Sequence, residues 1–407
     1  MTTHFFFAPF IAWLSLLIWV ILLVARGGFW RARPMSALGA TTIKAVGDDE
    51  VSRRGEWPAL VAVVPARNEA DVIGPAVGSL LRQDYPGAFH VIVIDDDSTD
   101  GTAAAAAATA RDLGLEDRLT VLTAKPLPPG WSGKVWAQSQ GIAAVTELGL
   151  AAEFLLLTDA DIHHPADAAT QLVARTILED RDLVSLMVRL RCDSLWEKAL
   201  IPAFVFFFAK LYPFAWVSDV RKATSGAAGG CMLVRRSALE EAGGMESIRH
   251  ELIDDCSLAE RIKHRRGQDH ARPIRLDLAE SSESLRPYDS WRDIWNMIAR
   301  TAFTQLRYSP LLLAGTVIGM FLIYLVPPLF ALAMGTLAWP AWAAWILMCI
   351  AYAPMLRYYR RSILWAPALP LIALFYVSAT IGSAVRYWTG KGGQWKTRVQ
   401  APSRSDA

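Results

Sequence analysis

Apolar residues form long uncharged runs at the two ends of the chain and short runs in its middle. The first long run, Phe5 to Ala25, would be about 31 Å long as a helix, which matches the hydrocarbon core of a bilayer. A second, Pro310 to Met355, is long enough for two spans with a turn around Gly335, and a third, Ile363 to Val385, contains two prolines. The pattern predicts a membrane protein with spans at both ends.

Basic residues beside these runs predict their orientation. Arg26, Arg31 and Arg33 follow the first run, so the positive-inside rule places the N-terminus outside and the following domain in the cytoplasm. No basic residue precedes this run, which favours a retained anchor over a cleaved signal peptide. A single span from Ile363 would place the C-terminal tail outside, yet that tail is basic and favours the inside. A re-entrant or in-plane final segment is the alternative.

Between roughly Trp57 and Arg307 short apolar runs alternate with helical patterns. Four runs are nearly continuous, as expected for parallel strands covered on both faces: Leu60–Val64, His90–Ile94, Leu119–Leu122 and Phe154–Leu157. The alanine-rich stretch from Thr102 to Arg111 predicts a helix. The alternation predicts a doubly wound α/β sheet, in which ligands bind beyond the carboxyl ends of the strands.

The composition excludes several classes of protein. Hydrophobic residues make up 53% of the 407 residues, charged residues make up 20%, and the mean hydropathy is +0.26. These values exclude a disordered chain, a coiled coil and a purely soluble enzyme. The formal charge is only +2, from 41 basic and 39 acidic residues, so nothing indicates a nucleic-acid partner. The 4 cysteines are scattered, without a C-x-x-C pair, so we expect neither disulfides nor a cysteine zinc site.

Carboxylates follow three of the predicted strands. They lie in Pro65–Glu69 after the first, Asp95–Gly101 after the second and Thr158–Asp161 after the fourth, and should gather at one edge of the sheet. Asp159 and Asp161 leave an extended backbone on the same face, which suits a hard divalent ion that also holds phosphate oxygens. Helix capping is the alternative for Asp95–Gly101, because Asp, Ser and Thr all cap helices.

Other nucleotide-binding patterns are missing. No G-x-G-x-x-G follows the first strand, and the segment from Gly130 to Lys134 lacks the spacing of a Walker A loop. Lys134, at the start of a predicted helix, could still reach a phosphate; a solvated surface lysine is the alternative.

In this order the motifs resemble those of the inverting, membrane-bound glycosyltransferases of family 2, which have the GT-A fold with its Rossmann-like, mostly parallel sheet. The resemblance covers about Trp57 to Tyr308. It rests on six segments: Val63–Glu69, Val93–Gly101, Gly133–Lys134, Asp159–Asp161, Gly226–Arg236 and Asp254–Arg261. The chain departs from the family pattern in three motifs. Asp97 replaces a Gly, and Asp254 replaces a Glu. In the Q-x-x-R-W element, Thr304 and Tyr308 replace the Gln and the Trp, while Arg307 is kept.

The resemblance implies a role for each motif. Asp255 would be the general base, with Asp254 and Arg307 as further catalytic residues. Asp161 and Asp159 would hold Mg²⁺ or Mn²⁺ on the diphosphate of a nucleotide sugar, with UDP as the nucleotide. The donor-binding residues would be Pro65, Arg67, Glu69, Asp95, Asp96, Lys134 and Asp159.

Two histidines follow the D-x-D pair directly. We interpret His163 and His164 as residues that shape the loop before Pro165; a third metal ligand is the alternative.

The implied domains are an N-terminal anchor (1–30), a cytoplasmic GT-A domain (57–308), C-terminal membrane helices (309–385) and a basic tail (386–407). Within the GT-A domain, the apolar run from Ala199 to Ala209 lies between Lys198 and Lys210 and, at about 17 Å, is too short to span. It predicts an in-plane interfacial helix near 195–217 that lets a lipid hydroxyl reach Asp255; a buried core helix is the alternative.

More narrowly, the chain resembles the hopanoid-biosynthesis-associated glycosyltransferases of bacteria, through Thr158–His164, Arg300–Tyr308 and Gly390–Lys396; ceramide glucosyltransferases are also similar. This implies transfer of a sugar to a membrane lipid such as a hopanoid, by a multi-pass protein of the bacterial inner membrane. Three alternatives stay open: a processive polysaccharide synthase, a nucleotidyltransferase and a non-catalytic nucleotide-binding membrane scaffold. The altered Q-x-x-R-W element argues against the first, the second would not need Asp255, and the full set of carboxylates argues against the third.

Overall fold

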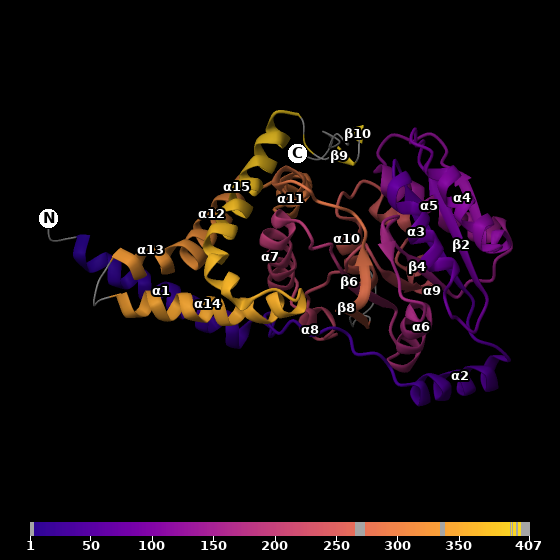
Figure 1. Cartoon of the computed structure of the whole chain (residues 1–407), viewed down its shortest axis with the longest axis horizontal. Helices are drawn as coiled ribbons and strands as arrows, with labels where there is room; N and C mark the ends of the chain where they lie inside the picture. The colour runs from indigo at the N-terminus through magenta and orange to yellow at the C-terminus, as the bar shows by residue number, and fades with distance from the viewer. Residues whose placement is uncertain are drawn as a thin grey trace. The chain divides into compact units, whose positions relative to one another are not determined.

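The computed structural model divides the chain into a helical unit and an α/β unit (Figure 1). It describes residues 4–264, 273–333, 338–390, 392, 394–395 and 398–399. The helical unit comprises Met1–Arg33, Cys192–Ala215 and Tyr288–Gln394, and the α/β unit comprises Pro34–Arg191, Trp216–Pro287 and Trp395–Ala407. Most of the predicted basic tail and the turn expected around Gly335 lie outside the described residues, apart from the short strands β9 (Gln394–Trp395) and β10 (Arg398–Val399).

The α/β unit contains an eight-stranded sheet in the order β3-β2-β1-β4-β7-β6-β8-β5. The four predicted strands are confirmed as β1 (Leu60–Ala66), β2 (Phe89–Asp95), β3 (Leu119–Thr123) and β4 (Phe154–Leu157), and they pair in parallel. The remaining strands are β5 (Ile162–His163), β6 (Leu183–Arg189), β7 (Met232–Arg235) and β8 (Ile274–Ser284). Because β7 runs antiparallel to β4 and β6, and β5 antiparallel to β8, the sheet is mixed rather than wholly parallel.

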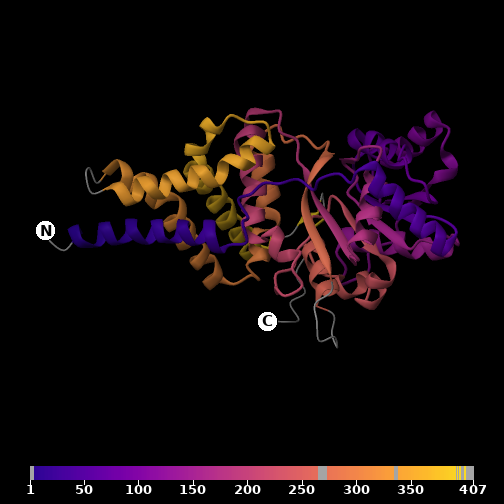
Figure 2. The ribbon, with the colours of Figure 1, turned by 90° about the horizontal axis from the view of Figure 1, so that it is seen from below.

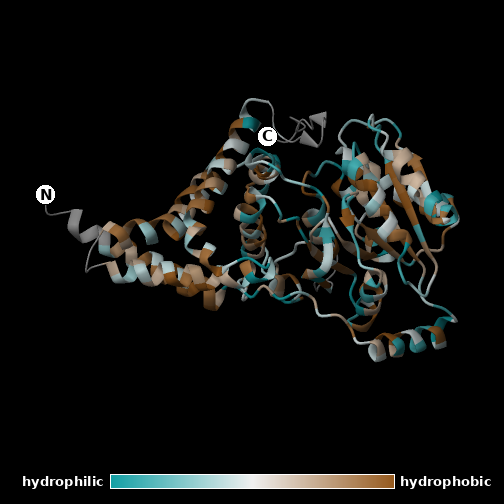
Figure 3. Ribbon diagram, in the orientation of Figure 1, coloured by the Kyte–Doolittle hydropathy of each residue, from teal (hydrophilic) through white to brown (hydrophobic). Residues whose placement is uncertain are grey.

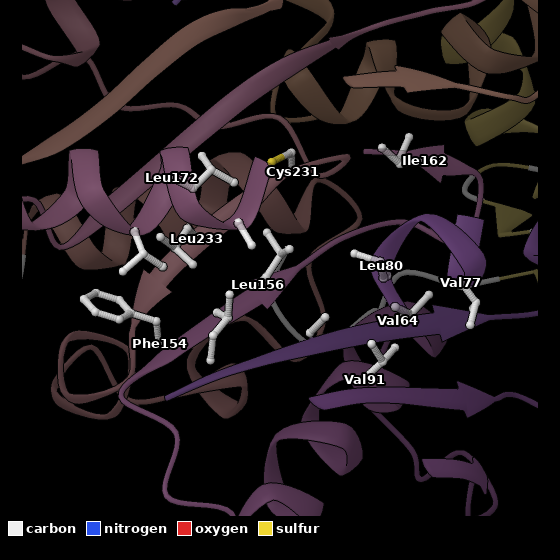
Figure 4. Packing of buried hydrophobic residues seen from close by; sticks show 14 of the residues in the cluster. Val64, Val77, Leu80, Val91, Phe154, Leu156, Ile162, Leu172, Cys231 and Leu233 are labelled. Atoms are coloured by element: carbon white, nitrogen blue, oxygen red, sulfur yellow. The ribbon is translucent and has the colours of Figure 1, made fainter. Parts of the chain in front are cut away.

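The helices of this unit are α2 (Ala40–Arg54), α3 (Ala70–Leu81), α4 (Thr102–Leu113), α5 (Gly133–Glu147), α6 (Ala168–Leu178), α9 (Arg236–Glu241) and α10 (Asp254–Lys263). One of them, α5, approaches the sheet unusually closely. A Cβ atom at Gly141 of α5 would lie 2.3 Å from Ile94 Cδ1 and 2.6 Å from Val63 Cγ1, so only glycine allows this contact. Buried side chains from strands and helices, Leu156, Leu172 and Leu233 among them, form the core (Figure 4).

The helical unit contains α1 (His4–Ala25), α7 (Leu195–Leu211), α11 (Trp291–Gln305), α12 (Pro310–Met320), α13 (Val326–Ala333), α14 (Trp339–Tyr358) and α15 (Leu369–Trp388). The short helix α8 (Phe214–Val217) follows α7. In both views α1 lies beside α14 (Figures 1 and 2), and apolar residues predominate along these helices (Figure 3).

Four helical segments of the described chain are long and apolar enough to cross a membrane: Leu195–Val217, Pro310–Ala333, Trp339–Tyr358 and Ile363–Trp388. The second and third confirm that the block from Pro310 to Met355 forms two long apolar helices. The last includes a 3₁₀ turn, Ile363–Ala368, that contains Pro367, and it is long enough to span without a break. The side of the membrane on which each end lies stays a prediction.

The helix α7 is longer than the sequence predicted. Ser194 and Glu197 form a reciprocal capping box, which starts the helix at Leu195 and gives it 17 residues instead of the 11-residue run from Ala199 to Ala209. The argument that the segment is too short to span was therefore wrong. Its in-plane placement at the interface stays a prediction.

A π-helical turn, Phe321–Leu325, joins α12 to α13. Pro327 and Pro328 follow it and lack the N–H groups that would bond the carbonyls one turn earlier. Two side chains of α1 supply donors instead: Ser15 Oγ donates to Leu322 O (2.8 Å) and Trp19 Nε1 donates to Ile323 O (2.8 Å). Backbone polar groups in this candidate span are thus satisfied by a neighbouring helix, as a lipid environment would require.

Candidate active site

The parallel register brings the ends of β1 and β2 to one edge of the sheet. Ala66 pairs with Asp95, so the loops that follow lie side by side. Side chains fasten these loops together: Asn68 accepts from Thr99 N (2.9 Å), and Asp100 accepts from Ala70 N (2.9 Å) and Thr102 N (3.0 Å). Asp100 therefore caps both helices, which bears out the capping alternative for this one residue of the Asp95–Gly101 run.

Asp95 and Asp96 do not take part in this capping. Arg67 donates to the backbone carbonyl of Asp96 and lies 3.4 Å from its Oδ2 atom, and both side chains are buried. Asp95 is 8% exposed, and its Oδ1 atom has no hydrogen-bond partner among the described residues. A buried carboxylate oxygen without a donor is costly, and a ligand N–H or O–H would satisfy it. Pro65 lies within β1, immediately before these loops.

Asp97 occupies a left-handed backbone position, with φ 56°, and its side chain is 75% exposed. Glycine adopts this conformation without steric cost, which suits the glycine that the resemblance implies at this position. The Oδ2 atom of Asp97 also lies 3.8 Å from Arg67 Nη1, so the departure adds a second negative charge beside the pair of Arg67 and Asp96.

Lys134 connects the predicted donor-binding residue Asp159 with Asp254, which precedes the predicted base in the chain. Its ammonium lies 2.8 Å from Asp159 Oδ1 and 3.2 Å from Asp254 Oδ2, so it connects the end of β4 with the start of α10. The solvated-surface alternative for Lys134 is wrong, because its side chain is only 18% exposed and makes both ion pairs. Burial alone would lower the pKa of Lys134, but Asp159, Asp254 and Asp255 outweigh it and hold the pKa above its usual value.

Both carboxylate oxygens of Asp255 accept backbone hydrogen bonds. Gly229 N donates to Oδ2 (2.8 Å) and Cys256 N donates to Oδ1 (2.7 Å). Burial, followed by the negative charge of Asp254, raises the pKa of Asp255 to about 6; the ammonium of Lys134 and the two N–H groups oppose that rise. A carboxylate with a pKa near neutrality is well matched to proton abstraction.

Gly229 lies close to two charged side chains. A Cβ atom there would lie 3.0 Å from Lys134 Nζ and 3.4 Å from Asp255 Oδ2. The predicted glycine segment, Gly226–Arg236, therefore runs beside Asp255 and contains β7.

Asp161 is held by two residues that the sequence reading missed. Its Oδ2 atom accepts from Ser284 Oγ (2.9 Å) and Arg286 Nε (3.1 Å), and Arg286 Nη2 also donates to Glu69 Oε1 (2.5 Å). Arg286 thus joins the predicted metal ligand to a predicted donor-binding residue. The polar end of β8, Ser281 to Ser284, gave no apolar pattern that would have marked it as a strand.

The carboxylates at the end of β4 fit a divalent ion that brings its own phosphate ligands. Among the described residues, no group of three His, Cys, Asp or Glu side chains could hold a metal by itself. Asp159 and Asp161 offer hard oxygen ligands two residues apart, and Mg²⁺ commonly binds through one or two carboxylates plus substrate phosphates.

His164 shapes the loop rather than offering a metal ligand. Its ring nitrogens contact Thr158 Oγ1 (3.0 Å) and Ser282 Oγ (3.1 Å), and burial lowers its pKa to about 4. His163 lies in β5, where its backbone pairs with Glu283.

Arg307 belongs to the helical unit and is not part of the cluster described above. Its side chain is exposed and its φ is 51°. The residues that replace the family Gln and Trp contact each other, since Thr304 Oγ1 lies 3.1 Å from Tyr308 OH, and Tyr308 stacks on Tyr387 with ring centroids 4.5 Å apart. The catalytic role of Arg307 stays a prediction.

Comparisons with known proteins bear on the fold of the chain. Residues 61–243 match the model of glycosyl transferase family 2. A mannosyltransferase from Pyrobaculum calidifontis, solved with GDP-mannose and Mn²⁺, is similar with a TM-score of 0.52 and 18% identity, over 96% of this chain and 100% of that one.

Weaker likeness extends to glucosyl-3-phosphoglycerate synthase from Mycobacterium tuberculosis, solved with Mn²⁺, UDP and glucosyl-3-phosphoglycerate (TM-score 0.42, 19% identity, 68% of this chain and 87% of that one). Mannosyl-3-phosphoglycerate synthase from Rubrobacter xylanophilus follows (TM-score 0.37, 18% identity, 66% and 83%). No curated protein matches the chain. Residues 61–243 are thus similar to glycosyl transferase family 2, and the mixed, mostly parallel sheet of the α/β unit has the GT-A fold.

Proposed function

We propose that the protein is an inverting glycosyltransferase that moves a sugar from a nucleotide sugar, with UDP as the nucleotide, to the hydroxyl of a membrane lipid. The observation that carries the proposal is the cluster in which Lys134 connects Asp159, on the donor side, to Asp254 beside the base Asp255. A nucleotidyltransferase would have no use for a half-buried carboxylate with a pKa near 6 at this position.

The donor would bind across the edge of the sheet. Asp95 has a buried oxygen that suits an N–H of the nucleobase or a ribose hydroxyl, and the pair of Arg67 and Asp96 forms the adjoining wall. Asp161 and Asp159 would hold Mg²⁺ or Mn²⁺, which neutralises charge on the departing diphosphate. The ammonium of Lys134, only 2.8 Å from Asp159, would stabilise the same charge.

Asp255 would remove the proton from the acceptor hydroxyl as its oxygen attacks the anomeric carbon. The bond between that carbon and the diphosphate oxygen breaks on the opposite face, so the configuration inverts and the nucleoside diphosphate leaves with the bonding electrons. The N–H groups of Gly229 and Cys256 hold the carboxylate in place and are fixed before the reaction begins.

The composition of the helical unit supports a lipid acceptor. Four segments of the described chain could cross a bilayer, so the site belongs to a protein whose hydroxyl substrates are plentiful in the membrane. The resemblance to hopanoid-associated enzymes makes a hopanoid hydroxyl the first acceptor to test. We place the protein in the bacterial inner membrane with the α/β unit facing the cytoplasm, where nucleotide sugars are made.

The experiment that tests this function measures labelled sugar entering the lipid extract. Membranes that contain the protein are incubated with Mn²⁺ and a panel of labelled nucleotide sugars, beside an EDTA control and Asp255→Asn. Label in the lipid phase that both controls abolish is the expected result, and binding of the nucleotide should survive in Asp255→Asn. Activity that survives in Asp255→Asn would instead favour a nucleotidyltransferase, and a long polymer product would favour a processive synthase. Nucleotide binding without turnover of any donor would favour a scaffold.

A further inference from the structure

Lys210 places a cation within an apolar helical segment. It lies in the last turn of α7, inside Leu195–Val217, which is long and apolar enough to cross a membrane. A charged side chain in such a segment is expensive to keep and usually has a function.

Aromatic rings and a hydroxyl surround the ammonium group of Lys210. Its Nζ atom donates to Tyr324 OH (2.9 Å), lies 4.7 Å from the centroid of the Tyr324 ring and 5.5 Å from that of Phe207, and approaches Met320 Sδ (3.8 Å). Tyr324 belongs to the π-helical turn, so this unusual backbone element presents the hydroxyl to the lysine. These contacts hold the cation without cancelling its charge.

Lys210 has no carboxylate within ion-pair distance in the part of the chain that the structure describes. The nearest carboxylate on its own helix, that of Glu197, accepts instead from the N–H groups of Asp193, Ser194 and Tyr288 at the other end of α7. The side chain of Lys210 is half-buried rather than fully buried.

Arg26 brings a second cation to the same end of α7. It directly follows α1, and its guanidinium donates to the carbonyls of Lys210 (3.1 Å) and Leu211 (3.1 Å). Both cations thus lie where an apolar helix ends, the depth at which lysine and arginine reach lipid headgroups.

The helical unit as a whole lacks acidic residues to balance its cations. Its described residues include 12 lysines and arginines but 4 aspartates and glutamates, whereas the whole chain has 41 and 39. The excess positive charge of the protein therefore lies in the unit that contains the candidate spans.

We propose that Lys210 and Arg26 form a binding site for the phosphate of an anionic phospholipid. Phosphate oxygens would accept hydrogen bonds from the N–H groups of Lys210 that do not donate to Tyr324. The acyl chains would lie along the apolar surfaces of α1 and α7. This site does not depend on the proposed glycosyl transfer, and the lipid it binds need not be the acceptor.

The test uses the full chain, purified in detergent and examined by native mass spectrometry with added phosphatidylglycerol or phosphatidylcholine. Lys210→Met should weaken phosphatidylglycerol binding about fivefold, the effect of one cation near an anionic headgroup. Lys198→Met is the matched control, because it removes a half-buried lysine from the opposite end of the same helix. That control and the charge-keeping Lys210→Arg should both bind phosphatidylglycerol as the wild type does.

Three outcomes would overturn the proposal. In the first, Lys210→Met retains phosphatidylglycerol as well as the wild type does. In the second, Lys198→Met loses as much as Lys210→Met, which would mean that charge anywhere on α7 suffices. In the third, millimolar inorganic phosphate displaces the lipid and phosphatidylcholine binds equally well, which would mean a site for free phosphate. The melting temperature of each variant in detergent separates lost binding from lost folding.

Discussion

The surroundings of Asp255 move its pKa away from the ordinary value of an aspartate. Two backbone N–H groups and Lys134 stabilise its charged form, while burial and Asp254 oppose that form, and the balance raises its pKa to about 6. Two neighbours of opposite charge thus act on the same carboxyl group in opposite directions, which gives a pair of variants with opposite expectations.

The first prediction concerns the acid side of the pH profile. The base works when deprotonated, so kcat/KM should fall about tenfold per unit below pH about 6. Asp254→Asn removes a negative neighbour and should move this limb to lower pH. Lys134→Met removes a positive neighbour and should move it to higher pH, besides lowering kcat. If the acid limb moves in the same direction in both variants, the assignment of this limb to Asp255 is contradicted.

The second prediction concerns Arg286, the residue that joins Asp161 to Glu69. Arg286→Gln leaves two largely buried carboxylates without their cation, so the melting temperature should fall by several degrees, equivalent to about 2 kcal/mol for a partly exposed pair. A divalent ion can replace the lost charge. Addition of Mn²⁺ should therefore raise the melting temperature of the variant more than that of the wild type, and equal effects on both would count against a metal at Asp161.

The helix α10 carries the proposed base, Asp255, in its first turn and the buried Lys263 in its last turn. Lys263 is fully buried, and its Nζ atom donates to the carbonyls of Trp216 (3.3 Å), Val217 (2.7 Å), Asp219 (3.1 Å) and Thr224 (2.7 Å). The same helix thus fixes the loop 216–224, which leads into the glycine segment that contacts Asp255.

The third prediction is that Lys263→Met opens this loop. Four carbonyls would lose their shared donor, which should cost about 3 kcal/mol or more of the free energy of unfolding. Trypsin should then cut after Arg221 or Lys222 much faster than in the wild type. Lys222→Met, on the same loop, is the control for stability and should leave the melting temperature within a degree or two. A loop that stays resistant in Lys263→Met would mean that the lysine does not hold it.

Within the sheet, the predictable elements were those with a continuous apolar pattern. The strands β1 and β4 are buried throughout and β2 over its last five residues, because parallel strands covered on both faces need apolar side chains throughout. The strand β3, at the edge of the sheet, is only half-buried. The antiparallel direction of β7 and the pairing of β5 with β8 were not predictable, since both depend on partners far away in the sequence. The length of α7 was misjudged because its start depends on a capping box rather than on the apolar run.

For the whole molecule, the candidate spans make a prediction about extraction. Four long apolar helical segments should keep the protein in the membrane pellet after a wash in alkaline carbonate, and only detergent should release it. Release by the wash would mean that the helices lie on the surface of the bilayer. Treatment of right-side-out and inverted vesicles with protease would then show which side the α/β unit faces.

The sequence by itself determined the features that depend on local pattern. These are the apolar segments, the parallel strands and the carboxylates at their carboxyl ends, because period, length and strand order follow from neighbouring residues. The tertiary structure decided which of those groups meet. Arg286 reaches Asp161 across 125 residues and Glu69 across 217, and Gly229 donates to Asp255 across 26. Such contacts form only when separate strands and helices pack together, so no local pattern encodes them.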